Sequence, residues 1–224
     1  MAYSPTCSRS STRHQDANWW RLLPTGGLAV FLWLLWGLPA LALELRVAIR
    51  EDASQVVVGT SNAGMVRDMQ GQQIAQVPQG RSLTVSPQGS QIKAANAVGT
   101  SFWVEPGADG YVFIGDRWYR GRVLVKSSGS GVTAINYVDL EQYLYSVVGG
   151  EMPTSWPVEA LKSQAVAARS YVLYRRQRAR NPHYDVGTTT SWQVYKGLEA
   201  EAPSTHTAVE ATRNQVLTYN GQVI

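Results

Sequence analysis

Cysteine and histidine are almost absent from this chain. Its one cysteine is Cys7, and its three histidines are His14, His183 and His206. Beyond Cys7 there is no thiol, which excludes disulfides, thiolate zinc sites and a cysteine nucleophile from that part. His183 and Asp185 stand close together, but no third ligand follows at a recognisable metal-site spacing. We therefore expect no metal and no other cofactor.

Several other signatures of function are missing. There is no G-x-S-x-G nucleophile elbow and no Gly-rich phosphate loop. After residue 42 the chain carries 17 basic and 15 acidic residues, and no basic stripe is interleaved with aromatic residues. A nucleic-acid partner is therefore not expected. The basic run RRQRAR, residues 175–180, suits the end of a helix, where cations offset the helix dipole, but it could also meet an anionic polymer.

The one long hydrophobic run is GGLAVFLWLLWGLPALAL, residues 26–43. It follows Arg13 and Arg21 and contains Ala40-Leu41-Ala42, the small-x-small pattern of a cleavage site. The pattern predicts a signal peptide over residues 1–42, and the alternative is an uncleaved N-terminal anchor. Either segment would place the remainder outside the cytoplasm, as an exported protein of the periplasm, cell wall or extracellular space.

Residues 43–134 are expected to form a β-rich N-terminal part. Apolar and polar residues alternate with period two in LELRVAIRE (43–51) and GYVFIGDRWYRGRVLVKSS (110–128), and GVTAINYV (131–138) continues this pattern. With 44% hydrophobic and 16% charged residues, the composition is that of a globular protein. Together with the helical pattern that follows, this predicts an α+β fold in which the β-rich part packs on a helical segment.

The helical pattern begins at Asp139. Asp139 is a predicted N-cap with Gln142 three residues on, and Gly149-Gly150 is expected to end this short helix. A second helix should open near residues 154–155, with Pro157 in its first turn, and stop at Asn181-Pro182. Its expected apolar side consists of Val158, Leu161, Ala165, Ala168 and Val172. A short helix between short strands is expected near residues 204–214.

Glu151 stands between these two helices. A general acid or base needs a fixed position and apolar neighbours, and Met152, Pro153 and Trp156 could supply them. The start of the next helix would instead favour the charged carboxylate. The residues alone leave both roles open, a helix-start acid and a catalyst.

The block EMPTSWPVEALKSQAVAARSYVLY (151–174) followed by YDVGTTTSWQVYKG (184–197) resembles the SpoIID/LytB family of exported proteins. The likeness runs from about residue 135 to 197 and is weaker at 117–125 and 208–224. It implies that residues 135–224 are a catalytic core, and that the protein is a peptidoglycan lytic transglycosylase acting on glycan strands. The alternative is a non-enzymatic cell-wall protein that binds glycan or stimulates an N-acetylmuramoyl-L-alanine amidase. A glycosidase that uses water is a third hypothesis.

The resemblance also implies site residues. The acid of the E-M-P motif falls on Glu151, which would protonate the departing glycosidic oxygen and then accept a proton from the C6 hydroxyl, giving a 1,6-anhydro sugar. Substrate positioning or support of the site would fall on Lys162, Gln164, Arg169, Gln193 and Tyr195.

Two departures from the family pattern stand out. Gly187, Ser191 and Trp192 occupy positions where some members carry cysteines and a histidine that suit a metal, so no metal site is implied here. Family members usually continue beyond the equivalent of Ile224 with a Ser/Gly-rich segment. The expectation is a core truncated at its C-terminal end.

Overall fold

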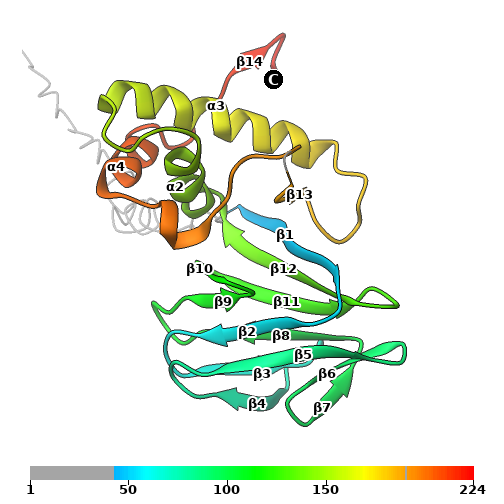
Figure 1. Ribbon diagram of the computed structural model, residues 1–224. Helices are drawn as coiled ribbons and strands as arrows, with labels where there is room; N and C mark the ends of the chain where they lie inside the picture. Colours follow the sequence, from blue (N-terminus) through cyan, green and yellow to red (C-terminus); the bar gives the residue numbers. More distant parts are fainter. Residues whose placement is uncertain (1–42, 190) are drawn as a thin grey trace, which may run out of the picture. The chain divides into compact units, whose positions relative to one another are not determined.

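The computed structural model describes residues 43–189 and 191–224 (Figure 1). The predicted signal peptide or anchor, residues 1–42, lies outside the described residues. Within residues 43–224 other than 190, no helix is both long and apolar enough to cross a membrane.

Two β-sheets form the larger part of the described structure. The seven-stranded sheet has the order β13-β1-β12-β11-β8-β3-β4, and the six-stranded sheet has the order β10-β9-β2-β5-β6-β7. All neighbours are antiparallel except β13, which runs parallel to β1. The strands of the first sheet are β1 (Glu44–Ala53), β3 (Gly64–Arg67), β4 (Gln73–Val77), β8 (Ser101–Glu105), β11 (Arg122–Ser127), β12 (Val132–Asp139) and β13 (Val186–Gly187). Those of the second are β2 (Val56–Thr60), β5 (Ser82–Gln88), β6 (Gln91–Ala94), β7 (Ala97–Gly99), β9 (Val112–Ile114) and β10 (Arg117–Tyr119).

The period-two pattern produces the core shared by the two sheets. In β8, Phe102 and Val104 are buried, and they pair with Val125 and Val123 of β11. Burying a side chain of this size contributes about 1.5–3 kcal/mol, and such inward positions recur on strands of both sheets within one hydrophobic cluster. The predicted α+β fold with a β-rich N-terminal part is confirmed.

The helices follow β12 and lie beyond the ends of β1 and β12 in Figure 1. They are α2 (Leu140–Glu151), α3 (Val158–Gln177), the short 3₁₀ helix η2 (Gly197–Ala200) and α4 (Pro203–Ala211); β14 (Thr218–Tyr219) and β15 (Gln222–Val223) form a terminal hairpin. Asp139 caps α2 as predicted, since its Oδ1 accepts the backbone N–H groups of Glu141 and Gln142 at 2.9 and 3.1 Å. The expected domain boundary between residues 134 and 135 falls inside β12.

The predicted end of the first helix is wrong. α2 continues through Gly149 and Gly150 and ends at Glu151, with Met152 as its C-cap. The two glycines keep helical backbone, and their lack of a side chain lets another segment approach. The glycine pair therefore serves packing rather than helix termination.

The second helix is also shorter than expected. α3 begins at Val158 with Pro157 as its N-cap and ends at Gln177, before Asn181-Pro182. Val158 is 40% exposed and does not belong to the apolar side, because it lies in the first turn next to the exposed Trp156 and Pro157. The other four predicted members of that side are buried: Leu161, Ala165, Ala168 and Val172.

A buried ion pair joins the helices. Arg169 of α3 donates from Nη2 to Oε2 of Glu141 at 2.6 Å and from Nε to Oε1 at 3.0 Å. The side chains are 1% and 6% exposed. The same guanidinium also donates to the carbonyl oxygens of Val209 in α4 and of Gln215. One cation therefore ties α2, α3, α4 and the segment that follows α4.

We expect Arg169→Met to lower the free energy of unfolding by about 3–5 kcal/mol, because it leaves the Glu141 carboxylate buried without its partner. Chemical denaturation of the purified protein measures this loss. Adding Glu141→Leu to Arg169→Met should recover part of it, since no buried charge then remains. Arg213→Met is the control, because Arg213 pairs with Glu210 on the surface and such pairs contribute about 0–1 kcal/mol. Equal losses of unfolding free energy for Arg169→Met and Arg213→Met would contradict the conclusion that the buried ion pair holds the helices together.

Candidate active site

Glu151 is the last residue of α2, and its side chain is exposed. Its Oε1 accepts a hydrogen bond from the backbone N–H of Val194 at 2.8 Å. The next helix starts at Val158, so Glu151 lies at a helix C-terminus and the role of helix-start acid is wrong. The carboxylate is held by one contact from a distant segment and is still open to solvent.

The segment after Trp192 lies directly on the last turn of α2. A Cβ atom on Gly150 would lie 2.6 Å from the carbonyl oxygen of Val194, and one on Gly149 would collide with the carbonyl oxygen of Ala200. Val194 thus faces Gly150 through its carbonyl and Glu151 through its N–H. The glycine pair sets how closely this segment approaches the carboxylate.

Gln193 fixes the same segment from the other side. The O–H of Tyr143 in α2 donates to Gln193 Oε1, and Gln193 Nε2 donates to the carbonyl oxygen of Ala168 in α3, both at 3.3 Å. Burial raises the pKa of the Tyr143 phenol, so this donor stays protonated. Gln193 therefore holds the segment between the two helices.

Tyr195 anchors the segment to the sheet. It is 5% exposed, and its O–H donates to Oδ1 of the buried Asn136 in β12 at 2.8 Å. Burial raises the pKa of this phenol well above its usual value. Its ring lies 4.7 Å from that of Tyr143, centroid to centroid. The buried side chain does not reach solvent, so of the two predicted roles of Tyr195 its position fits support of the site rather than substrate positioning.

The remaining predicted site residues lie along α3. Lys162 donates from Nζ to Glu159 Oε1 at 2.7 Å within its own helix, and Gln164 is half-buried. Arg169 is 1% exposed and enclosed by the ion pair with Glu141, so of its two predicted roles its position fits support of the site rather than substrate positioning. The structure brings Glu151, Gln193 and Tyr195 together around one segment, and contacts with a ligand stay a prediction for Lys162 and Gln164.

Apolar residues follow Glu151 along the chain, and the apolar Val194 contacts it through its backbone N–H. Met152 packs against the core, whereas Trp156 and Val194 are 50% and 38% exposed. An exposed indole offers a flat face of the kind that sugars use. In the part of the chain that the structure describes, no three His, Cys, Asp or Glu side chains gather to hold a metal ion. Gly187 lies against the indole of Trp192, with a Cβ position 3.0 Å from Nε1.

Three contributors to this site were not predicted from the sequence: the backbone N–H of Val194, the phenol of Tyr143 and the amide of Asn136. The N–H is carried by every non-proline residue, so no sequence signal identifies it. The Gly149-Gly150 pair did indicate that another segment could lie close to α2 next to Glu151. A glycine pair equally fits the end of a helix, so it did not decide between the two.

Gly150→Ala should lower the free energy of unfolding and loosen the Val194 segment. Alanine alone stabilises a helix by about 1 kcal/mol relative to glycine, but overpacking against the Val194 carbonyl costs about 1–3 kcal/mol. Chemical denaturation and hydrogen exchange of the Val194 amide measure the two effects. Gln142→Ala in the same helix is the control, because it adds no atom. A Gly150→Ala variant more stable than the parent would contradict the close approach.

Comparison with known proteins agrees with the resemblance in the sequence. The family model of SpoIID, "Stage II sporulation protein", matches residues 128–219. An uncharacterised protein of Brachyspira hyodysenteriae is 38% identical over 117 residues, 52% of this chain and 32% of that protein. The amidase enhancer of Bacillus subtilis is 43% identical over 81 residues, 36% of this chain and 10% of that protein. Stage II sporulation protein D of Bacillus subtilis is 32% identical over 108 residues, 41% of this chain and 31% of that protein.

These alignments span about a third or less of the relatives' own length. The family match covers β12, α2, α3, α4 and the segment that holds Glu151. The likeness to the SpoIID family model is therefore confined to residues 128–219 of this chain.

Proposed function

We propose that this protein is a peptidoglycan lytic transglycosylase that cleaves glycan strands after N-acetylmuramic acid, with Glu151 as its acid and base. The observation that supports this is the state of the Glu151 carboxylate. Oε1 is fixed by the Val194 N–H at 2.8 Å, and Oε2 makes no hydrogen bond within the described residues. A fixed carboxylate with one oxygen open to solvent can exchange a proton with a bound polymer.

The reaction needs one carboxyl group in two protonation states. Protonated Glu151 gives its proton to the glycosidic oxygen as the C1–O bond breaks and positive charge develops at C1. The resulting carboxylate takes the proton of the C6 hydroxyl while that oxygen bonds to C1. The products are a 1,6-anhydro sugar and a shortened strand, Glu151 is protonated again, and no water is consumed. The Val194 N–H would stabilise the carboxylate between the two steps.

Support for the site comes from residues that do not touch the reacting atoms. Gln193, Tyr195 and Arg169 would hold the segment and helices around Glu151 through the contacts described above. Lys162 and Gln164, on the accessible part of α3, would contact the glycan. The hydrophobic N-terminal segment supports an export route, so the site would meet its substrate outside the cytoplasm.

A second function is a non-enzymatic one. The amidase enhancer of Bacillus subtilis is 43% identical to this chain over 81 residues. On that ground the protein would bind glycan strands and stimulate a cell-wall amidase, with Glu151 serving the shape of the site and not its chemistry.

Glu151→Gln separates the two functions. The amide keeps the shape and can still accept from Val194, but it cannot give up a carboxyl proton. We expect cleavage to fall by about 10²–10⁴-fold, the usual contribution of general acid–base catalysis. Mass spectrometry of peptidoglycan after incubation with the parent protein should show 1,6-anhydro ends, and the variant should leave the strands intact while still binding them.

Glu44→Gln is the matched control, because Glu44 is an exposed acid of β1 that pairs with Arg122 and with none of the predicted site residues. It should cleave like the parent. Reducing ends in place of anhydro ends would indicate hydrolysis by water. Cleavage by Glu151→Gln at the parent rate would remove Glu151 from its proposed role. No cleavage by the parent, together with stimulation of an added amidase, would establish the second function.

A further inference from the structure

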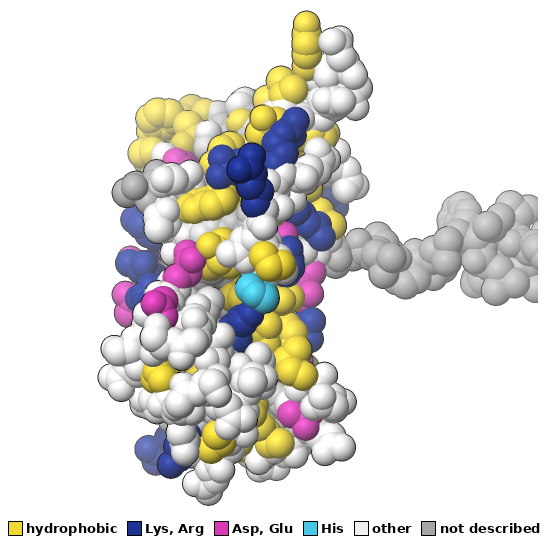
Figure 2. Space-filling view, turned by 90° about the vertical axis from the view of Figure 1, so that its right-hand side faces the viewer, with side chains coloured by type: hydrophobic (Ala, Val, Ile, Leu, Met, Phe, Trp, Pro, Cys, Tyr) yellow, Lys and Arg dark blue, Asp and Glu magenta, His cyan; other side chains and the backbone are white. Residues whose placement is uncertain are grey.

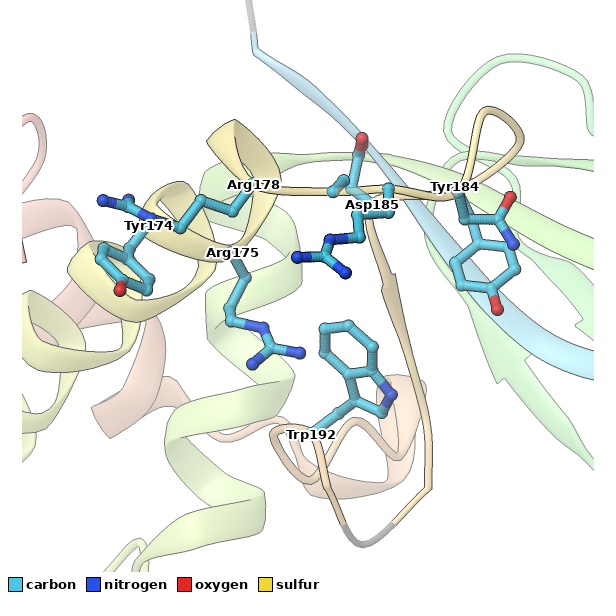
Figure 3. Close-up of a pocket in the computed structure, with 9 residues that line it drawn as sticks. Tyr174, Arg175, Arg178, Tyr184, Asp185 and Trp192 are labelled. Carbon is cyan, nitrogen blue, oxygen red and sulfur yellow. The ribbon is translucent and has the colours of Figure 1, made fainter.

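A pocket outside the immediate surroundings of Glu151 lies at the C-terminal end of α3 (Figure 3). Its volume is about 430 Å³. Figure 2 shows Lys and Arg side chains gathered in the upper part of the face it draws, beside hydrophobic side chains. Aromatic and cationic side chains dominate the lining of this pocket, which we call the arginine pocket: Tyr174, Arg175, Arg178, Arg180, Tyr184 and Trp192.

Unlike most arginines of the described residues, the three arginines of this pocket form no ion pair with an acid there. Of thirteen arginines in the described residues, nine form an ion pair with an acid there; the other four are Arg81 and the three of the arginine pocket. The nine are Arg46, Arg50, Arg67, Arg117, Arg120, Arg122, Arg169, Arg176 and Arg213. Three of the four arginines that lack an acidic partner in the described residues thus lie in one hollow of the surface.

Two of the guanidinium groups are held by aromatic faces. Arg175 lies over the ring of Trp192 at 4.3 Å, and Arg178 lies over the ring of Tyr174 at 3.8 Å. Figure 3 shows the Arg175 side chain pointing toward Trp192. Stacking fixes the plane of a guanidinium and leaves its N–H edge available for the two parallel hydrogen bonds that a carboxylate accepts.

Neither the acid in the pocket nor the helix dipole cancels this charge. Asp185 is 3% exposed and is bonded by Arg46 at 2.7 Å, with Arg176 at 3.9 Å. The C-terminal end of α3 contributes only about half a negative charge, against three guanidinium groups. The pocket therefore keeps a net positive charge.

The arginine pocket and Glu151 share one chain segment. Trp192 forms a wall of the pocket, and Val194, which binds Glu151, is only two residues further, at most about 7 Å along the backbone. The O–H of Tyr171 on α3 donates to the carbonyl oxygen of Ser191 at 3.3 Å, which holds this segment along the helix. A polymer bound at Glu151 could therefore extend directly into the pocket.

We propose that the arginine pocket is a carboxylate-binding subsite for the glycan strand, with Arg175 on Trp192 as its main contact. This inference rests on the proposed glycan substrate. Two carboxylate sources exist on such a strand: the lactyl group of the muramoyl sugar, which is free where no peptide is attached, and the carboxylates of an attached peptide. Both present the same planar anion to the guanidinium.

The test is a binding measurement in the Glu151→Gln background, which removes turnover. The variants are Arg175→Gln and Arg175→Lys, and Arg81→Gln is the control, because Arg81 also lacks an acidic partner in the described residues but lies outside the arginine pocket. The ligands are a neutral N-acetylglucosamine oligomer, glycan strands stripped of peptide, and strands that carry peptide. Isothermal titration calorimetry gives the dissociation constants.

Arg175→Gln should weaken binding of at least one carboxylate-bearing glycan by about 10- to 100-fold, the effect of a lost charge-assisted hydrogen bond. Its affinity for the neutral oligomer should stay within about twofold, and Arg175→Lys should fall between, since lysine keeps the charge without the planar fork. A loss on stripped strands identifies the lactyl group, and a loss confined to peptide-bearing strands identifies the peptide.

Unchanged binding of both carboxylate-bearing glycans by Arg175→Gln would overturn the proposal, and so would an equal loss on the neutral oligomer. The same losses in Arg81→Gln would indicate general charge attraction and would also overturn it. Failure of the proposed cleavage reaction is a separate result, because it is measured on the parent protein by its products and not by these dissociation constants.

Discussion

The arrangement of helices α2, α3 and α4 depends on the buried ion pair between Glu141 and Arg169. Burying both charges is costly, and it is tolerated because the guanidinium of Arg169 donates four hydrogen bonds. They go to the two carboxylate oxygens of Glu141 and to the carbonyl oxygens of Val209 and Gln215. This pair fixes the first turn of α2 relative to α3 and α4. The last turn of α2, which carries Glu151, is thereby placed as well.

The segment of residues 193–200 completes this placement. Tyr195 ties it to Asn136 in the sheet, Gln193 ties it between α2 and α3, and Gly149-Gly150 allows its backbone to lie against α2. A catalytic group needs a fixed position and access to substrate at once. Glu151 meets both needs, because its position is determined by backbone contacts on one side while its carboxylate stays exposed on the other.

The sequence predicted what depends on local pattern. Period-two alternation predicted the strands, and Asp139 predicted the start of α2, since a cap is a contact between residues two and three apart. The sequence pattern misplaced the end of α2, because a glycine pair fits both a helix terminus and the close approach of another segment. Only the positions of Val194 and Ala200 in the fold decide between these two. Glu151 was singled out by resemblance to a family. Its hydrogen-bond partner, the backbone N–H of Val194, could not be predicted, because a backbone N–H has no sequence signature.

The arginine pocket could not be predicted from a local sequence pattern either, as residues 175–180 show. As a sequence this run fits a solvated helix end as well as a contact with an anionic polymer, and it does not place either of them in a pocket. It becomes one side of a pocket because Val186 and Gly187 of β13 pair with β1, which turns the chain back so that Trp192 meets Arg175. The same returning segment then reaches Val194 and Glu151. The arginine pocket and Glu151 therefore both contact one segment of backbone, through Trp192 and Val194, and the distance between them is fixed. A polymer of regularly repeated sugars fits such an arrangement better than a small ligand does.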